Sequence, residues 1–135
     1  MKIRPGHVAI ASLLTLFSFQ AGAAEKTRFS VEFDRCIKAA GAVDPAVMEC
    51  QAKEWERQDK RLNLAYQKLL TKLTPQKKAE LRGVQRAWVA YAEAKCKFYY
   101  DNDELSGTLN RQSAQYCEVE ERALRAAELE DIAQW

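Results

Sequence analysis

The sequence predicts an all-α fold, namely a three-helix antiparallel bundle with a short N-terminal segment, stapled by two disulfides. Apolar residues recur at helical spacing over three long stretches of the chain. Glycine and proline are scarce, 5 and 3 of 135 residues, and they fall where helices should begin or end. Four cysteines follow the N-terminal apolar stretch and can supply two crosslinks. One domain of this size has a modest core, so crosslinks would matter.

The N-terminal residues predict an export signal. Lys2 and Arg4 precede an apolar stretch from Val8 to Phe19, and the small residues of Ala21-Gly22-Ala23 follow. This order is typical of a secretory signal peptide that is cut after Ala23, with Ala24 as the alternative cleavage point. The apolar stretch is shorter than the roughly 20 residues that span a bilayer. We therefore expect cleavage, with retention as a membrane anchor as the alternative.

Cleavage would divide the chain into a signal, residues 1–23, and one folded domain, residues 24–135. The loss of two cations from the total of 21 leaves the domain balanced against its 19 acidic residues. A near-neutral domain has no bulk attraction to nucleic acid or to anionic membranes. The one histidine, His7, lies in the signal, which excludes histidine-based catalysis by the domain. We expect a periplasmic or secreted protein that is not an enzyme and needs no cofactor or metal; its oligomeric state stays open.

The cysteines are Cys36, Cys50, Cys96 and Cys117. An even number of cysteines in an exported chain predicts disulfides, and four allow three pairings. We favour Cys36–Cys50 with Cys96–Cys117, because each bond closes a local loop and contributes about 3 kcal/mol to stability. A metal site is the alternative, but neither spacing resembles a zinc motif.

The first predicted elements are a short segment, Phe29 to Ala40, halted by Gly41, and a long helix that runs to Leu73. Asp44 and Pro45 resemble an N-cap followed by proline in the first turn. The predicted apolar stripe of the long helix comprises Met48, Trp55, Leu62, Tyr66, Leu69 and Leu73.

The second long helix is predicted to open with the cap Thr74 and Pro75 and to end near Tyr100. Gly83 interrupts it at a cost of about 1 kcal/mol, which a close approach of another helix would explain. Its predicted stripe comprises Leu81, Val84, Trp88, Tyr91 or Ala92, and Tyr99.

The third long helix is predicted from Leu109 to Ile132, after a polar connection. Two pairs at spacing i,i+4, Glu118–Arg122 and Glu121–Arg125, are expected on its solvent face. Its predicted stripe comprises Tyr116, Val119, Ala123, Leu124, Ala127 and Leu129.

Three polar residues interrupt these stripes. Asp59 falls inside the stripe of the first long helix, so we expect an arginine partner, Arg122 first and Arg86 second. A catalytic acid is the alternative for Asp59, but no second carboxylate or histidine supports it. Asn63 and Gln85 are expected to bond to each other or to backbone between helices, with a ligand contact as the alternative.

Two further groups carry competing interpretations. Trp55, Tyr66 and Trp88 are expected in the core, with a binding platform as the alternative. The acidic connection after the second long helix resembles a calcium loop, but Ser106 and Gln112 stand where glycine and glutamate are required. The other interpretations are a solvated loop or an acidic contact for a cationic partner. The carboxylates concerned are Asp101, Asp103 and Glu104.

The ordered cysteines and a set of helical positions together resemble the lysozyme inhibitor LprI family. The positions are Asp59, Leu62, Asn63, Tyr66, Leu81, Gln85, Trp88 and Arg122. The resemblance spans Cys36 to Leu129 and implies an exported, disulfide-stabilised helical domain that binds a protein partner. One branch of the family is associated with inhibiting lysozyme, by blocking it rather than by chemistry. The resemblance implies mainly structural roles for the shared positions. An envelope interaction or assembly protein without lysozyme activity is the alternative.

Overall fold

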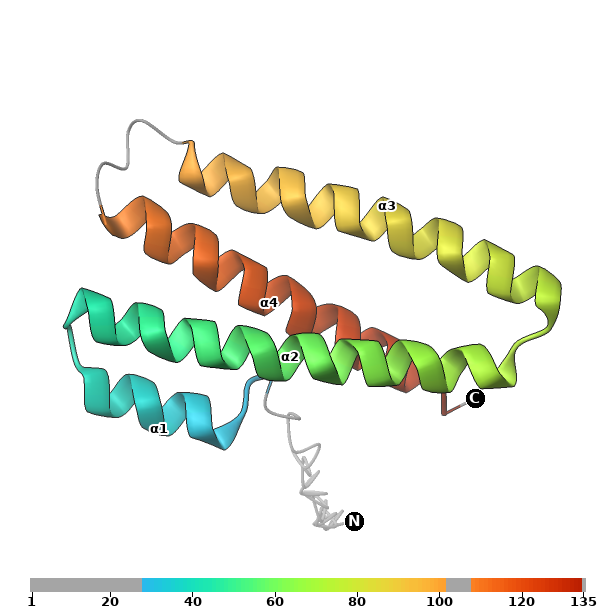
Figure 1. Cartoon of the computed structure of the whole chain (residues 1–135), viewed down its shortest axis with the longest axis horizontal. Helices are drawn as coiled ribbons and strands as arrows, with labels where there is room; N and C mark the ends of the chain where they lie inside the picture. Colours follow the sequence, from blue (N-terminus) through green and yellow to red (C-terminus); the bar gives the residue numbers. More distant parts are fainter. Residues whose placement is uncertain (1–27, 102–107, 135) are drawn as a thin grey trace, which may run out of the picture.

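The computed structural model describes residues 28–101 and 108–134. These residues form four helices and no strand: α1 (Val31–Ala40), α2 (Asp44–Lys72), α3 (Pro75–Tyr100) and α4 (Thr108–Ile132) (Figure 1). The predicted all-α class is therefore confirmed. The predicted number of three helices is wrong, because the short N-terminal segment is a helix of its own. The predicted signal peptide and its predicted cleavage point lie outside the described residues.

The α1 helix has clear boundaries in the sequence. The hydroxyl of Ser30 accepts a hydrogen bond from the backbone N–H of Phe33 at 3.0 Å, which caps the first turn. Gly41 ends the helix with a φ of 59°, a left-handed value that side chains disfavour. The Cys36–Cys50 disulfide then ties α1 to α2. These three features make a helix of ten residues stable beside α2.

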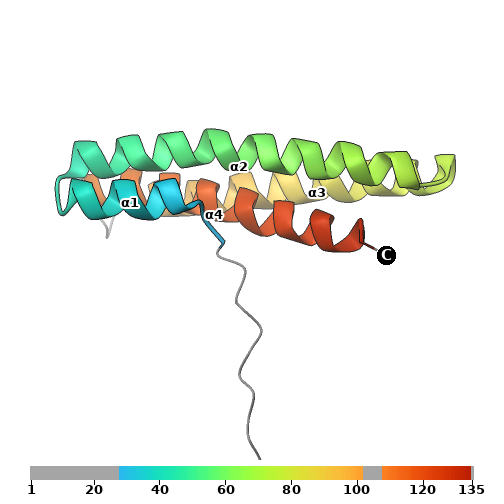
Figure 2. The same cartoon turned by 90° about the horizontal axis from the view of Figure 1, so that it is seen from below.

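The helices are arranged so that α4 lies between α2 and α3, and α1 covers the outer side of α2 (Figures 1 and 2). Successive helices run antiparallel, and consequently α2 and α4 run in the same direction (Figure 1). The largest contact joins α2 to α4, whereas α3 packs on α4 and barely touches α2. The predicted antiparallel bundle is thus open between α2 and α3.

The core lies between α2 and α4. Small residues of α4, such as Ala123 and Ala126, are fully buried and let the two helices approach closely. Leu69 of α2 and Leu129 of α4 belong to the central apolar cluster. Several residues of the predicted stripes are instead exposed. On α3 they are Val84, Tyr91 and Tyr99, because α3 is covered on one side only, whereas Ala92, the alternative to Tyr91, is buried; on α4 they are Tyr116 and Leu124.

Two local predictions about helix starts have different outcomes. Thr74 caps α3 as predicted, since its hydroxyl accepts a hydrogen bond from the backbone N–H of Lys77 at 3.3 Å. Asp44 is not an N-cap: α2 begins at Asp44 itself, and the cap position is Val43 without a side-chain bond. The carboxylate of Asp44 accepts instead from the amide of Gln112 at 3.0 Å, which joins α2 to α4.

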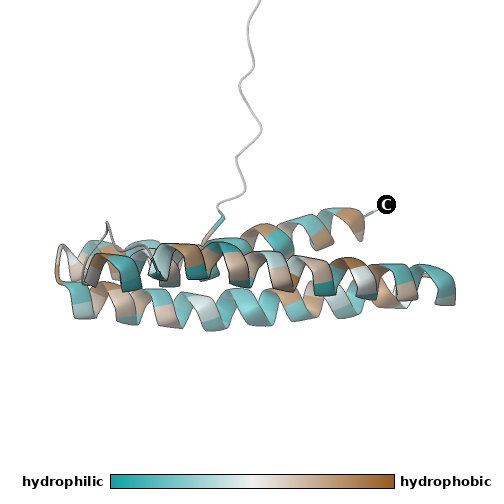
Figure 3. Ribbon diagram, turned by 90° about the horizontal axis from the view of Figure 1, so that it is seen from above, coloured by the Kyte–Doolittle hydropathy of each residue, from teal (hydrophilic) through white to brown (hydrophobic). Residues whose placement is uncertain are grey.

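Gly83 does not mark a close approach of helices, which was one explanation for a glycine at this position. A Cβ atom placed there would find the guanidinium of Arg86 as its nearest neighbour, at 4.0 Å. The predicted disulfide pairing is confirmed, because Cys96–Cys117 joins the end of α3 to α4 just as Cys36–Cys50 joins α1 to α2. In residues 28–101 and 108–134, none of the helices contains an uninterrupted apolar stretch that could span a bilayer. Each helix carries polar as well as apolar positions (Figure 3).

Candidate functional site

A groove runs between α2 and α3, where these helices stand apart, and α4 contributes to its lining. Its volume is about 510 Å³, within the range of ligand-binding clefts. We call it the α2–α3 groove. Its lining is Asp59, Leu62, Asn63 and Tyr66 of α2, Arg82, Gln85, Arg86, Trp88 and Val89 of α3, and Arg122 of α4.

The groove collects most of the positions that carry the family resemblance. Seven of the eight line it, although they come from three helices and were expected to be structural. The exception is Leu81, which packs against the apolar cluster between α2 and α4. Periodicity could not reveal this gathering, because it reports which face of a helix is apolar and not which helices stand apart.

An ion pair between α2 and α4 forms one wall of the groove. The Nε of Arg122 donates to the Oδ1 of Asp59 at 3.3 Å, as the sequence predicted. The guanidinium of Arg122 also lies 4.1 Å from the centre of the Trp55 ring, within the range of a cation–π contact. The Trp55 indole N–H donates to Glu118 at 3.0 Å. This network holds Arg122 in one position, and a catalytic role for Asp59 gains no support from it.

The two amides have different partners from those predicted. The amide of Asn63 donates to the backbone carbonyl of Asp59 at 2.9 Å and to its carboxylate at 3.0 Å. The carbonyl of Gln85 accepts from the Nε of Arg125 at 2.9 Å. The predicted Asn63–Gln85 bond is thus wrong, since each amide faces a closer charged group. Both side chains still line the groove.

The polar residues beside this groove on α4 are buried, contrary to prediction. Glu121 and Arg125 were expected on the solvent face, but they are only 5% and 4% exposed. Glu121 accepts from Lys95 of α3 at 2.6 Å, and this bond outweighs burial and raises the pKa of Lys95. Arg125 bonds to Gln85 and to Glu128. The α3–α4 interface is consequently held by charges as well as by apolar contacts.

The groove carries an excess of positive charge, with three arginines against one aspartate. Arg122 is already paired with Asp59. Arg82 and Arg86 lie one turn apart on α3 and are exposed. No carboxylate in the described part of the chain forms an ion pair with either of them. Their charges are available to a ligand.

The aromatic prediction has a mixed outcome. Trp55, Tyr66 and Trp88 are all half-buried. Tyr66 packs against the apolar cluster, yet Tyr66 and Trp88 also line the groove. Tyr66 therefore contributes to both the core and the groove, Trp88 contributes to the groove, and Trp55 contacts Arg122 instead.

A second, larger groove lies between α2 and the end of α4, with a volume of about 660 Å³. Its two arginines already form ion pairs with carboxylates of the protein. Arg61 forms a bidentate pair with Glu130 at 2.7 Å, and Arg57 pairs with Glu54 at 3.2 Å. It lacks aromatic residues in its lining. The α2–α3 groove is the better candidate site, because it combines unpaired arginines with aromatic rings.

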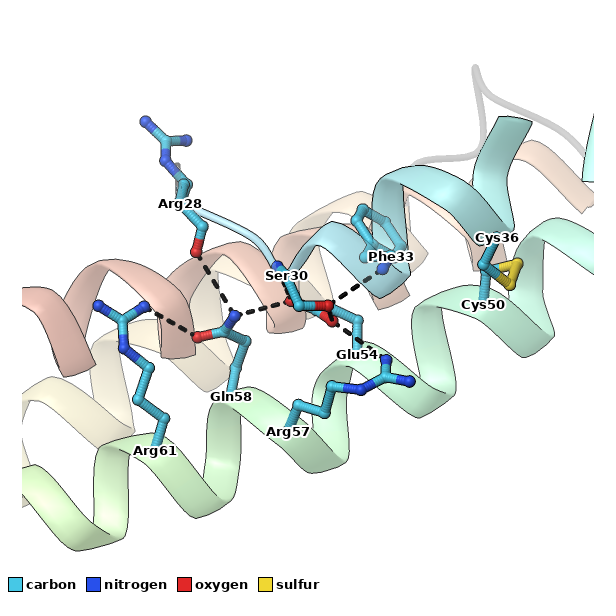
Figure 4. Close-up of polar contacts among 9 residues, drawn as sticks. All are labelled: Arg28, Ser30, Phe33, Cys36, Cys50, Glu54, Arg57, Gln58 and Arg61. Atoms are coloured by element: carbon cyan, nitrogen blue, oxygen red, sulfur yellow. Dashed lines mark hydrogen bonds and ion pairs between the residues drawn. A yellow bond between two sulfur atoms is a disulfide. The ribbon is translucent and has the colours of Figure 1, made fainter. Parts of the chain in front are cut away.

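The buried carboxylate of Glu54 on α2 binds Ser30, the residue that precedes α1 (Figure 4). Glu54 is 0% exposed and accepts from the backbone N–H of Ser30 at 2.8 Å and from its hydroxyl at 2.5 Å. Gln58 donates to the same carboxylate at 2.7 Å. Burial raises the pKa of Glu54, but the hydrogen bonds from Ser30, Gln58 and Arg57 together outweigh it and hold the pKa below its ordinary value.

The predicted acidic contact is described only at its first residue. Asp101 is exposed at the end of α3 and pairs with Lys97 one turn earlier. Asp103 and Glu104 lie outside the described residues. Among the residues described, no group of three or more potential ligands is arranged to hold a metal ion.

A family sequence model described as Lysozyme inhibitor LprI matches residues 36–129, well over half of the chain. The match begins at the first cysteine and covers all of α2 and α3 with most of α4. It includes both disulfides and every residue that lines the α2–α3 groove. No curated protein and no solved structure matches the chain.

Proposed function

Because this chain belongs to the lysozyme inhibitor LprI family, we propose that it is an exported protein that inhibits lysozyme-type muramidases. The family match carries this proposal. The family is one of inhibitors and not of catalysts, so the mechanism we propose is steric: the domain binds the enzyme and obstructs its cleft. A disulfide-tied helical domain suits this role, since a rigid binder loses little conformational entropy on association.

Export is part of the proposal. Residues 1–23 would act as the signal peptide, and residues 24–135 would work in the periplasm or outside the cell. Two disulfides support this location, because such bonds persist in oxidising compartments. A muramidase that acts on the cell wall works in the same compartments, so the exported protein would encounter it there.

The contact that we propose is the acidic connection between α3 and α4. The sequence places three carboxylates in this connection, Asp101, Asp103 and Glu104. The Cys96–Cys117 disulfide joins the two helices on either side of this connection. Animal lysozymes are cationic, and complementary charge accelerates association and makes it sensitive to salt.

The test is lysis of bacterial cell walls by an animal-type lysozyme in the presence of increasing amounts of the oxidised, exported protein. We expect saturable inhibition that weakens as salt rises. The variant D101N/D103N/E104Q should inhibit less and lose most of its salt dependence. The variant E32Q/D34N/E56Q removes three exposed carboxylates from α1 and α2 and should inhibit as the wild type does.

Two results would count against parts of this proposal. Equal inhibition by the wild type and the loop variant would exclude the acidic contact while leaving inhibition intact. No inhibition of animal-type or bacterial muramidases would exclude the function. The protein would then be an envelope interaction or assembly protein, and stable co-purification with another envelope protein would identify that role.

A further inference from the structure

We propose that the α2–α3 groove binds a compact ligand that carries a carboxylate. Arg82 and Arg86 would pair with the carboxylate, and Tyr66 and Trp88 would contact the body of the ligand. This site is separate from the acidic connection between α3 and α4. The inference therefore does not depend on whether the protein inhibits lysozyme.

The charge of the groove selects an anion. Arg82 and Arg86 lie one turn apart on the same helix, which places both side chains on the same edge of the groove. Neither forms an ion pair with a described carboxylate. Guanidinium groups bind carboxylates through paired, charge-assisted hydrogen bonds. Two adjacent unpaired guanidinium groups consequently favour a carboxylate over a neutral ligand.

The opposite wall offers that carboxylate no second free cation, because Arg122 is already paired with Asp59. Asp59 would repel an anion, but its charge is compensated by Arg122 at 3.3 Å and by the amide of Asn63 at 3.0 Å. The same two bonds orient Asp59 within the wall. A ligand carboxylate is thus drawn to the α3 arginines, and its neutral part faces α2.

The remaining lining suits the neutral part of such a ligand. Tyr66 and Trp88 each present a half-buried ring to the groove. Val89 adds an apolar surface that is 40% exposed. Asn63 and Gln85 bring amide groups that can bond to hydroxyl or amide groups of a ligand. A volume of about 510 Å³ admits a sugar or a short peptide.

The ligand that carries the carboxylate is either a sugar or a short peptide. Calorimetric titration with each type of ligand distinguishes the two. The oxidised, exported protein is titrated with N-acetylmuramic acid and with N-acetylglucosamine, which lacks the carboxylate-bearing ether. A third titration uses a blocked peptide with a single glutamate. We expect at least one carboxylate ligand to bind about tenfold or more tightly than the neutral sugar, with affinity falling as salt rises.

Two matched variants test the residues. R82Q/R86Q should weaken binding of the carboxylate ligand by about tenfold or more and leave any binding of the neutral sugar unchanged. K60Q/K68Q removes two cations from the lining of the other groove and should bind as the wild type does. Circular dichroism establishes that both variants are folded.

A measurement on the unaltered protein locates the site. The indole N–H of Trp88 should shift in the nuclear magnetic resonance spectrum on titration with the bound ligand. Binding of the peptide alone, or of the acidic sugar alone, supports the inference and names the source of the carboxylate. The inference is overturned if neither carboxylate ligand binds, if the neutral sugar binds equally well, or if R82Q/R86Q binds as tightly as the wild type.

Discussion

Arg122 on α4 lies over the indole ring of Trp55 on α2, with its guanidinium carbon 4.1 Å from the ring centre. The same side chain donates to Asp59, also on α2, at 3.3 Å. A planar guanidinium can make both contacts at once. One arginine therefore fixes the wall of the α2–α3 groove and joins the two helices that share the largest contact.

Replacing Arg122 by lysine should lower the free energy of unfolding by about 1 kcal/mol, because an ammonium group cannot both stack and form the directed bond. Asp59→Asn should cost less, about 0.5 kcal/mol, since the carboxylate is 37% exposed and its ion pair is screened by water. Urea unfolding of both single variants and the double variant measures the coupling. Strictly additive effects would show that the pair is not coupled.

Glu54 should make the protein sensitive to acid. Its pKa lies below the ordinary value of 4.5 because hydrogen bonds outweigh the effect of burial. A lowered pKa in the folded state contributes stability at neutral pH that is lost as the pH falls below about 4.5 toward the folded pKa. Urea unfolding at neutral and acidic pH should show this loss in the wild type.

The Glu54→Gln variant should be less stable at neutral pH and should lose less stability on acidification. Glu49→Gln is the matched control. The pKa of Glu49 is also lowered, through its hydrogen bond with Lys53, but Glu49 is exposed and lies on the outer face of α2. Its replacement should leave the acid response nearly unchanged. An equal acid response in wild type and Glu54→Gln would show that other groups control it.

The Cys36–Cys50 disulfide should stabilise α1 selectively. Its removal in C36A/C50A should lower the free energy of unfolding by about 3 kcal/mol. Because α1 packs chiefly on α2, its amide hydrogens should exchange much faster while those of α2 and α4 stay protected. Hydrogen exchange read by mass spectrometry measures this. In C96A/C117A the faster exchange should appear at the α3–α4 junction, and a uniform loss of protection in C36A/C50A would contradict the prediction.

Gly83→Ala should stabilise the protein by about 0.5–1 kcal/mol, because alanine is the better helix former and the new methyl meets only ordinary contact at 4.0 Å. Thermal unfolding measures the gain. Gly41→Ala is the contrasting control and should destabilise, since its φ of 59° is unfavourable for a side chain. A loss of stability in Gly83→Ala would indicate that the Arg86 side chain needs the space.

Local signals in the sequence determined the helical class, the bounds of the long helices and the disulfide pairing. Thr74 and Pro75 predict the start of α3 because capping depends on neighbours within one turn. The pairing follows from short loops between adjacent elements. Asp59 with Arg122 was also predictable, since a carboxylate inside an apolar stripe requires a cation.

Only the tertiary structure decided which face of α2 is buried in its first half. Apart from the disulfide-bonded Cys50, the buried positions there are polar, namely Gln51, Glu54 and Gln58, and they continue the helical line of Leu62 and Ala65. Apolar periodicity does not reveal such positions, because their side chains are polar. Burial of Glu54 and Gln58 is tolerable because Ser30 and Arg28, which are distant in sequence, form hydrogen bonds with them, and no local pattern specifies those partners.

The candidate site depends on tertiary structure for the same reason. The sequence singled out eight of the ten residues that line the α2–α3 groove, all but Arg82 and Val89, but their surroundings depend on the packing of α3 against α4 and its separation from α2. Helix spacing follows from the packing of side chains contributed by separate segments. The sequence by itself therefore determined the elements and their covalent ties. The packing of the helices decided that Arg82, Arg86, Tyr66 and Trp88 face a common space.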